Sequence, residues 1–587
     1  EVVLLVKAVS DSGVRTQEIP VVIQESIPDP EFSLEVPKVW NGRDPLVLSP
    51  RIHNRSELSH CDAEKFSYSW SVRGMATIHQ TKSDQLHLIR AQNSGTVTIE
   101  LSLNNGGRVV TRSKQIIVKE PVSDPWVLRI PTDDEMPVDH QFYARDDRGL
   151  GTLHCRGTLA EPADSVFLRL YRGDTLVVAE RKKVGDNLKY TLSTALEPGL
   201  VAYRSEFGVV NAGVEKILER AEDLVCGDVF VIQGQSNAEA WTDDRVVHPY
   251  RSPWLRSFGT PTTNPDRARD VVWGNALSFN GGSHHHHLQI GYWGVELGKL
   301  LIEKYQVPVC IVNGAQGGTR IDQHQRNESD PLDVKTIYGR LLWRLKEARL
   351  DHGVRAIIWH QGENDQGESG ATGEFGWVNY QELFVRMAAS WKQDYPNVQH
   401  YYVHQIWPGA CGGRSIESDR LRERQRRLPE QFSKMSLLST LGIRPGGGCH
   451  YAPEGYVAMA RQLFPVISQN HYGEKYAVPV TSPMIQRAIY STENRDEVTL
   501  VFDQSVNCKD TLTEQFFLDG NQPECLSVRS DANTVTIKLA RSSTATNLSY
   551  VRSGMWSESD DIILGENKLA ALTFCELPIA PFPTNKK

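Results

Sequence analysis

Apolar and polar positions follow two different rhythms along the chain. In its middle part, short apolar runs alternate with longer stretches in which apolar residues recur at helical spacing. The apolar runs predict strands at 229–232, 307–312, 354–359, 399–403 and 436–441. The helical patterns lie at about 292–305, 332–350, 377–394, 416–428 and 453–468. Because strands joined by helical crossovers form a parallel sheet, residues 226–474 are predicted to be a three-layer α/β/α sandwich.

The residues on both sides of this segment carry strand patterns separated by turn residues. We expect a multidomain protein with β-sandwich domains at 28–120, 121–225 and 475–587. In the first of these, Tyr68 and Trp70 mark a central strand, and the pattern resembles immunoglobulin-like and PKD-like modules. The strands of the last domain are predicted at 498–502, 534–538 and 571–574.

The beginning of the chain resembles the end of such a domain. An apolar run, a turn and a second apolar run occur within 1–27, and the same order returns within 97–118. The similarity indicates an internal repeat. Residues 1–27 are therefore predicted to be the last two strands of a β-sandwich module that lacks its opening strands.

Composition and charge exclude several classes of function. The chain of 587 residues is 40% hydrophobic and 23% charged, which is ordinary for folded domains. Its net charge of −8 is spread without a basic block, so we expect no nucleic-acid partner. No apolar run approaches the roughly 18 residues of a membrane helix, so we expect no membrane span. The chain begins at Glu1 without a signal-peptide pattern, and with its β-modules it is expected to be a processed, exported protein: secreted, periplasmic or cell-surface.

Nine cysteines are scattered along the chain. None forms a CxxC pair, so we expect no structural zinc site. The odd number leaves at least one free thiol, whatever else pairs. Cys508 with Cys525 is the most favoured bridge.

A long loop is predicted at about 243–290. It contains a tract of four histidines that ends at His287, which we interpret as loop-lining or adventitious metal-binding side chains. Trp241, Trp254 and Trp273 lie beside or within this loop, where we expect them to pack on the surface rather than stack on a bound ligand. We therefore predict no metal and no other cofactor.

Four polar segments stand where the predicted strands end. Three of them, at 234–237, 313–319 and 360–365, directly follow strands, and the fourth, at 449–455, precedes the last helix. Because the carboxyl ends of parallel strands share one edge of the sheet, we expect all four to meet there.

These segments supply the groups that acyl transfer needs: a nucleophile, a base and donors for the developing oxyanion. Ser236 is the candidate nucleophile and His450 the candidate base. Gly317 and Gly318 allow backbone N–H groups to approach a substrate, and Gln361 offers an amide donor. Each residue alone also fits an ordinary turn, cap or strand end. All of them together, in this order, favour a site for acyl transfer over four unrelated structural roles.

The motifs, in chain order, are Gly-Gln-Ser-Asn at 234–237, Gly-Gly-Thr at 317–319, Trp-His-Gln-Gly-Glu at 359–363, Leu-Arg-Glu-Arg-Gln at 421–425 and His450. Together they resemble the SGNH hydrolase superfamily, and within it the sialate O-acetylesterase group and related carbohydrate esterases. The resemblance covers about 226–470 well, the C-terminal domain loosely and the first 225 residues hardly at all.

This resemblance implies a serine esterase that removes O-acetyl groups from a carbohydrate, either sialic acid or an acetylated polysaccharide or glycan. Ser236 would attack the acetyl carbonyl, and His450 would take its proton and later activate water. The backbone N–H groups of Ser236 and Gly318, with the Gln361 side chain, would form the oxyanion hole. Asn237 and Gly317 would support them.

The chain departs from the family pattern just before the histidine. These enzymes usually carry an aspartate two or three residues earlier, and here both positions are glycine. Either His450 works in a dyad steered by a backbone carbonyl, or an acid arrives from elsewhere. Glu363 and Asp365 are the candidates, although Glu363 is expected mainly to hold loops together. The glycines also leave room for a bridge from Cys449 to Cys411.

A second departure follows the Gly-Gly-Thr motif. Asp322 and His324 stand where the family often has Glu and Trp, which affects the specificity of the pocket. Two other functions stay open. The missing aspartate would suit a non-catalytic glycan-binding protein on an esterase scaffold. A short-chain lipid (GDSL) esterase of the same superfamily would need a long apolar loop near the motifs, and none is apparent.

Overall fold

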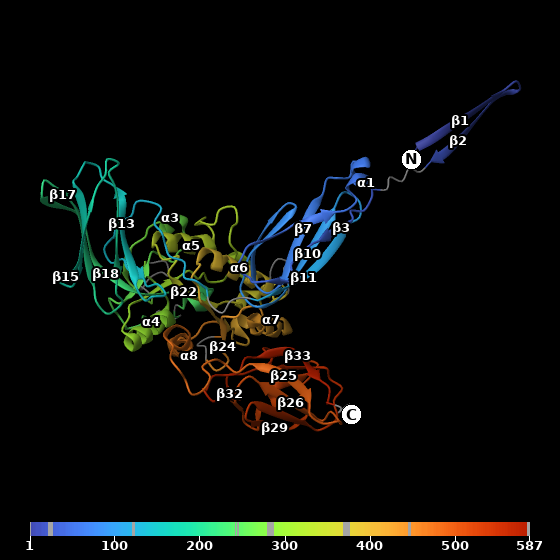
Figure 1. The fold of residues 1–587 in the computed structure, drawn as a ribbon. Helices are drawn as coiled ribbons and strands as arrows, with labels where there is room; N and C mark the ends of the chain where they lie inside the picture. The colour runs from blue at the N-terminus through green and yellow to red at the C-terminus, as the bar shows by residue number, and fades with distance from the viewer. Residues whose placement is uncertain are drawn as a thin grey trace. The chain divides into compact units, whose positions relative to one another are not determined.

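The chain divides into two units, residues 1–122 and 123–587, in the computed structural model. The structure describes residues 2–21, 27–119, 124–240, 242, 246–278, 287–367, 376–443 and 448–583. Trp241, residues 284–286 and Gly447, which the sequence singled out, lie outside the described residues. Figure 1 shows the elements in chain order.

The first unit consists almost entirely of antiparallel strands. The hairpin expected near the N-terminus is present as β1 (Val2–Ser10) and β2 (Gly13–Val21). The remaining elements are β3 (Phe32–Leu34), β4 (Val39–Trp40), β5 (Leu46–Leu48), β6 (Pro50–Ile52), α1 (Arg55–His60), β7 (Ser67–Gly74), β8 (Thr77–Lys82), β9 (Gln85–Ala91), β10 (Gly95–Asn104) and β11 (Val110–Val118). They form a four-stranded sheet of order β4-β11-β10-β7, a three-stranded sheet of order β5-β9-β8 and the pair β3–β6.

The strand with Tyr68 and Trp70 was predicted to be central, and this prediction is wrong. It is β7, which lies at the edge of the four-stranded sheet. The interior strand β10 has the stronger alternation, because Val97, Ile99 and Leu101 are fully buried and the residues between them are not. The alternation of buried and less buried residues marks the interior strand β10, whereas the aromatic residues of β7 do not mark an interior strand.

Strand β18 joins a β-rich module to the α/β sheet within the second unit. The module contains β12 (Phe142–Ala144), β13 (Gly151–Thr158), β14 (Ser165–Arg172), β15 (Thr175–Lys183), β16 (Lys189–Leu196), β17 (Tyr203–Asn211) and β18 (Val214–Gly234). The first half of β18 pairs antiparallel with β17, and its second half pairs parallel with β21 and β22. The limit expected at residue 225 thus falls inside one continuous strand of 21 residues.

The α/β sheet has the order β20-β19-β21-β18-β22-β23-β24. Its other strands are β19 (Leu255–Phe258), β20 (Trp273–Asn275), β21 (Val309–Asn313), β22 (Val354–His360), β23 (His400–Gln405) and β24 (Met435–Ser439). All neighbours are parallel except β20, which is antiparallel to β19. The five predicted strands are present, but β19 and β20 lie in the segment predicted as a loop. With four and three residues, these two strands are too short to show a strand pattern in the sequence.

Helices lie on both faces of this sheet. They are α2 (Ser236–Glu239), α3 (Pro265–Ala268), α4 (Tyr292–Tyr305), α5 (Ile337–Glu347), α6 (Tyr380–Asp394), α7 (Ile416–Arg426) and α8 (Pro453–Tyr472), with 3-10 turns η1 (Ile321–His324), η2 (Glu363–Asp365), η3 (Ala410–Gly412) and η4 (Leu428–Glu430). A further 3-10 turn, η5 (Leu512–Gln515), belongs to the C-terminal β-structure. Phe230 and Ile232 of β18 share one buried cluster with α4 and α8. On the opposite face, Trp359 of β22 contacts Phe384 and Trp391 of α6. Figure 1 shows α4 and α8 on one side of β22 and α5 and α6 on the other, so the mixed α/β class predicted from the sequence is confirmed.

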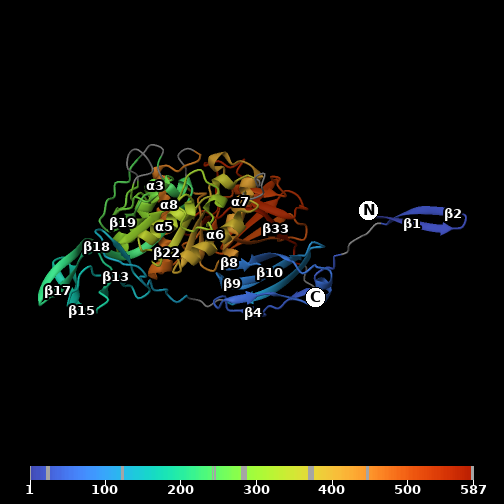
Figure 2. The same cartoon turned by 90° about the horizontal axis from the view of Figure 1, so that it is seen from above.

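The C-terminal part is again β-structure. Its strands are β25 (Ile485–Tyr490), β26 (Glu497–Phe502), β27 (Val506–Asn507), β28 (Phe516–Leu518), β29 (Cys525–Asp531), β30 (Thr534–Leu539), β31 (Asn547–Tyr550), β32 (Leu564–Gly565) and β33 (Phe574–Ala580). Seven of them form a sheet of order β28-β31-β33-β25-β26-β30-β29. The closing strand was predicted at 571–574 but begins only at Phe574, as β33. Thr573, just before it, is buried and does not pair with another strand: its backbone bonds the Gln405 side chain, and its hydroxyl accepts from Arg422 of α7. Figure 2 shows β33 beside α7.

The bridge predicted between Cys508 and Cys525 is wrong, because both thiols are free. Cys508 donates its backbone N–H to the Ser530 hydroxyl, near the end of β29, whereas Cys525 begins that strand. Five residues of extended chain span about 16 Å, which is beyond the reach of a disulfide.

The side chain of Asp228 connects three segments at the amino end of the central sheet. It is buried and accepts hydrogen bonds from Arg145 (2.7 Å), Arg355 (2.6 Å) and the Tyr472 hydroxyl (2.7 Å). The two guanidinium groups lower the pKa of this carboxyl although burial opposes them. The interaction holds the β-rich module, β22 and the end of α8 on β18.

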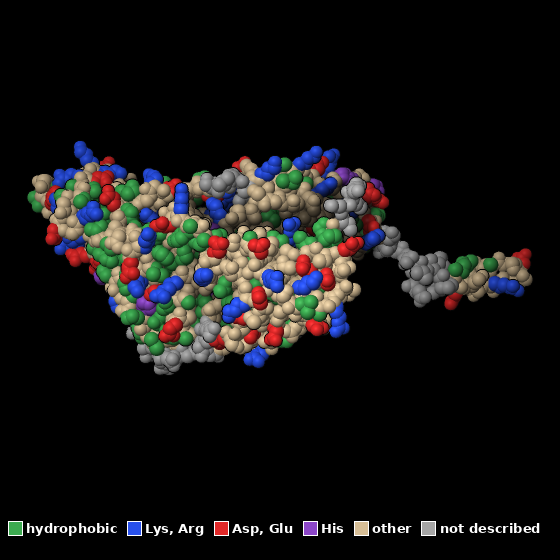
Figure 3. Space-filling view, turned by 90° about the horizontal axis from the view of Figure 1, so that it is seen from below, with side chains coloured by type: hydrophobic (Ala, Val, Ile, Leu, Met, Phe, Trp, Pro, Cys, Tyr) green, Lys and Arg blue, Asp and Glu red, His purple; other side chains and the backbone are tan. Residues whose placement is uncertain are grey.

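Basic and acidic side chains are interspersed on the molecular face drawn in Figure 3. No single-sign patch dominates that face, in keeping with the small net charge. Within the described ranges, every helix is too short or too polar to cross a bilayer.

Candidate active site

Ser236 lies at the point where β18 turns into α2. The turn needs Gly234, which has a φ of 140°. A Cβ atom there would come within 2.1 Å of the carbonyl oxygen of His360. The next residue, Gln235, donates its backbone N–H to the same oxygen at 3.0 Å. The serine is therefore held at the carboxyl edge of the sheet, with 8% of its surface exposed.

The glycine-containing loop after β21 lies against this serine. Gln316 donates its backbone N–H to the carbonyl oxygen of Gly234 at 3.0 Å. A Cβ atom on Gly317 would lie 3.5 Å from the Ser236 Cβ and 2.9 Å from a Glu239 carboxylate oxygen. Gly318 has a φ of +70° and open space around its Cα. The loop thus packs against the Ser236 turn, and at Gly317 a larger residue would crowd the Glu239 carboxylate.

The structure assigns Gln361 a different part from the one expected. Its side-chain amide donates to the carbonyl oxygen of Thr319 at 3.1 Å and to the Asp365 carboxylate at 2.6 Å. A primary amide has only two N–H donors, so neither is left for a substrate oxygen. The expectation that Gln361 serves as an oxyanion donor is corrected on this ground: the side chain braces two loops.

Asn364 was not among the predicted site residues. It is exposed and lies beside the serine turn. Its side-chain oxygen accepts from the Gln235 amide at 2.9 Å. Among the described residues, the Asn364 side-chain N–H₂ group has no acceptor. The sequence could have indicated Asn364 as a candidate, because it belongs to the same polar segment as Gln361 and Glu363.

Asn237 joins the serine turn to the other loops. Its amide donates to Glu363 at 2.8 Å and to the carbonyl oxygen of Cys449 at 3.0 Å. Its side-chain oxygen accepts from the Tyr456 hydroxyl at 3.1 Å, and its backbone oxygen accepts from the Trp293 indole at 3.0 Å. One buried side chain therefore ties together the first, third and fourth polar segments.

Glu363 is buried beneath these loops. Burial raises the pKa of its carboxyl, while the hydrogen bond from Asn237 and the charge of His450 oppose the rise. The second carboxylate oxygen is buried and has no hydrogen-bond partner within the described part of the chain. Glu363 thus lies within electrostatic reach of His450, with one oxygen fixed by Asn237.

Asp365 has a different environment. Its carboxylate accepts from Gln361 and from the backbone N–H groups of Ile321 (3.0 Å) and Gly376 (3.4 Å). Burial raises the pKa of this carboxyl to about 6. None of these three donors lies on the His450 loop.

The His450 loop is fastened by a disulfide. Cys449 is bonded to Cys411, which lies in η3, and their Cα atoms are 4.2 Å apart. This pairing was expected from the sequence and is confirmed. The backbone N–H of Cys411 also donates to the carbonyl oxygen of Gly448 at 2.8 Å. His450 is half-buried.

Two of the residues singled out near the pocket belong to the protein interior. His324 is buried against Trp359 and bonds the Thr319 hydroxyl at 2.8 Å, and burial lowers the pKa of its imidazole to about 3. Trp273 is buried beside Phe258, with ring centroids 4.7 Å apart. Both side chains pack inside the protein, and the expectation that Trp273 packs on the surface is wrong.

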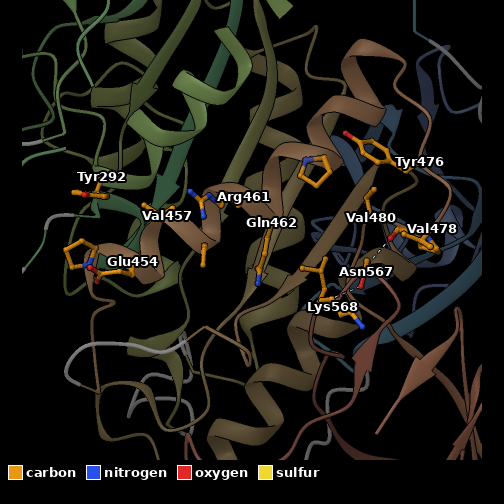
Figure 4. Close-up of a pocket in the computed structure, with 15 residues that line it drawn as sticks. Tyr292, Glu454, Val457, Arg461, Gln462, Tyr476, Val478, Val480, Asn567 and Lys568 are labelled. Atoms are coloured by element: carbon orange, nitrogen blue, oxygen red, sulfur yellow. Dashed lines mark hydrogen bonds between the residues drawn. The ribbon is translucent and has the colours of Figure 1, made fainter. Parts of the chain in front are cut away.

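A groove of about 740 Å³ lies along α8, which begins directly after the His450 loop. Figure 4 shows Tyr292 and Glu454 at one end and Asn567 and Lys568 at the other, with Arg461 between them. Ser236 and His450 are not part of its lining. Within the described ranges, no three His, Cys, Asp or Glu side chains are grouped so that they could hold a metal ion.

The comparisons with known proteins agree with this arrangement of motifs. Residues 226–467 match the family model described as carbohydrate esterase, sialic acid-specific acetylesterase. We refer to these residues as the esterase domain, after the family model that they match.

Solved structures similar to the chain include a carbohydrate acetylesterase from Xanthomonas citri. It shares 18% identity and a TM-score of 0.51, over 78% of this chain and 100% of its own. A protein from Arabidopsis thaliana shares 19% identity and a TM-score of 0.33, over 42% of this chain and 98% of its own. The first likeness extends the shared fold beyond the esterase domain. A search of curated proteins gave no significant match.

Proposed function

We propose that the chain is a serine esterase that removes O-acetyl groups from a carbohydrate through an acetyl-enzyme intermediate. The observation that carries this proposal is the pair of hydrogen bonds from Asn237, next to Ser236, to Glu363 and to the residue before His450. They connect the nucleophile turn, an acid and the histidine loop at one edge of the sheet.

In the acylation step, the Ser236 hydroxyl attacks the acetyl carbonyl carbon and His450 accepts its proton. The tetrahedral intermediate collapses, and the sugar oxygen leaves with the proton from His450. Water then attacks the acetyl-serine, again with His450 as base, and acetate is released. The backbone N–H groups of Ser236 and Gly318 stabilise the negative oxygen in both steps.

Asn364 supplies the third donor in place of Gln361. Its oxygen is held by Gln235, the neighbour of Ser236, so its N–H₂ group is oriented without being consumed. An exposed, oriented amide beside the nucleophile meets the requirement for a donor aimed at a developing charge.

Glu363 takes the place of the missing aspartate as the acid that stabilises the protonated His450. Its buried second oxygen and its electrostatic interaction with His450 support this role. Asp365 is not given this role, because its hydrogen-bond donors are on other loops.

The wider organisation is also part of the proposal. We assign the SGNH-type α/β/α sandwich to 226–474, β-sandwich domains to 28–120, 121–225 and 475–587, and the end of a further module to 1–27. The chain would act outside the cytoplasm on an acetylated sialoside, polysaccharide or other glycan, without a cofactor.

Hydrolysis of p-nitrophenyl acetate by the full chain tests the reaction. We expect Ser236→Ala to lower kcat by about 10³-fold or more. If the wild type and Ser236→Ala are equally inert, the proposal is wrong and a glycan-binding role replaces it. Acetate release from acetylated sialosides, xylan and pectin then identifies the substrate class. A preference for octanoyl over acetyl esters would indicate a lipid esterase instead.

A further inference from the structure

Directly after His450 the chain enters the core at Tyr451, so the contacts that the disulfide could supplement are those ahead of the histidine. Gly448 is exposed, has a φ of +79° and contributes no side chain. Ahead of the histidine, the described chain is held by the Cys411–Cys449 disulfide, by the bond from the Cys411 N–H to Gly448 and by the bond from Asn237 to Cys449. Only the first of these is covalent.

The other end of the disulfide is firmly placed. Ala410, the neighbour of Cys411, is 2% exposed and belongs to the core between the sheet and α8. Its carbonyl oxygen accepts from the Gln366 amide at 2.8 Å, and the same amide donates to the carbonyl oxygen of Glu363 at 3.0 Å. The disulfide therefore ties the residue before His450 to the segment that also holds Glu363.

We propose that this disulfide positions the His450 imidazole, so that the esterase is fully active only while Cys411 and Cys449 are bonded. The inference rests on the proposed function. The two positions that usually carry an aspartate to orient the histidine are glycines here. The disulfide to Cys411 supplies a restraint on the His450 loop in place of that aspartate. Cys411 and Cys449 are positioning residues, because neither takes part in the reaction itself.

The disulfide is open to chemical reduction, since Cys411 is exposed and Cys449 is half-buried. A dithiol such as dithiothreitol breaks the S–S bond with two electrons and two protons. Two cysteine thiols form, and the dithiol becomes a cyclic disulfide. Ahead of His450, the described residues then keep two hydrogen bonds, from the Asn237 side chain to Cys449 and from the Cys411 N–H to Gly448. Gly448 has no side chain to restrict its backbone. His450 spends less time in the geometry needed to accept the Ser236 proton.

The experiment compares p-nitrophenyl acetate kinetics of the oxidised, reduced and reoxidised full chain. We expect reduction to lower kcat by about 10- to 100-fold with KM nearly unchanged, and reoxidation to restore it. The rate at which an organophosphate labels Ser236 should fall in parallel. Cys411→Ser/Cys449→Ser should start low and not respond to dithiol. Cys508→Ser/Cys525→Ser, which removes two free thiols, should respond as the wild type does.

Equal kcat in the oxidised and reduced forms would overturn the inference, as would a change in KM alone. A fall in kcat accompanied by loss of far-UV circular dichroism or of the melting transition would also overturn it, because the bond would then serve the fold and not the histidine. Absence of hydrolysis by the oxidised wild type would overturn the proposed function itself and this inference with it.

Discussion

Asn237 and Cys449 are 212 positions apart in the sequence, and the Asn237 amide donates to the Cys449 carbonyl oxygen at 3.0 Å. This bond brings the residue after the candidate nucleophile to the residue before the candidate base. A short buried amide is well suited to the task, because it has two donors and here serves a carboxylate and a carbonyl at once.

Asn237→Ala should lower kcat by about 10- to 100-fold, because the His450 loop and Glu363 both lose their hydrogen bond to the serine turn. Glu363 would also be left buried with one hydrogen bond fewer, so unfolding should become easier by about 1–3 kcal/mol. Ester hydrolysis and chemical denaturation measure the two effects. Tyr456→Phe is the matched control, since it removes one bond to the Asn237 oxygen and leaves both donated bonds in place. An equal loss of kcat in both variants would contradict this role.

The two candidate oxyanion donors can be separated by their different environments. Asn364→Ala should lower kcat by about 10²-fold with little loss of stability, because its side chain is exposed and its N–H₂ group stabilises only the transition state. Gln361→Ala should mainly destabilise the protein, since its buried amide bonds Thr319 and Asp365. Steady-state kinetics with thermal unfolding distinguishes the two. If Gln361→Ala instead loses kcat at unchanged stability, the assignment is reversed.

The sequence predicted which loops come together at the candidate site but not every side chain's hydrogen bonds in it. Strand ends and polar segments predicted which loops meet at the edge of the sheet, because a parallel sheet brings its carboxyl ends together whatever the loops contain. Which donor of each loop is free depends on hydrogen bonds between loops. Gln361 and Asn364 are three residues apart and chemically alike, and only the positions of Thr319, Asp365 and Gln235 tell them apart.

The same limit applies to the fold. Strand β18 continues through the predicted domain limit, because its first half pairs with β17 and its second half with β21. The sequence of one strand does not show which strands it pairs with. Likewise, Cys508 and Cys525 are close in sequence, but Cys525 begins β29 and Cys508 lies beside the other end of that strand. Cys411 and Cys449 are 38 positions apart and are bonded.

Asp228→Asn should destabilise the protein by about 3–5 kcal/mol, because Arg145 and Arg355 would be left near a buried site without a counter-charge. The carboxyl pKa is lowered in the folded protein, so its stabilisation is complete above the ordinary pKa of aspartate and is lost as the pH falls below it. Urea unfolding at neutral pH measures the difference. Glu430→Gln, which breaks an exposed pair with Arg427, should cost less than about 1 kcal/mol. Similar values for the two variants would be inconsistent with a buried ion cluster.

Asp365 should make folding more favourable as the solution becomes mildly acidic. Its pKa is raised from 3.8 to about 6 in the folded protein, so between these values the folded state binds the proton that the unfolded state releases. Stability contributed by this group therefore falls as the pH rises through the window and returns as the pH falls. Relative to Asp365→Asn, which cannot titrate, the wild type should gain about 1–1.5 kcal/mol between about pH 7 and about pH 5. Urea unfolding of both proteins at the two pH values gives this difference, and groups common to both cancel. A difference that does not change with pH would show that Asp365 keeps its charge throughout, and the three donors around it would then outweigh its burial.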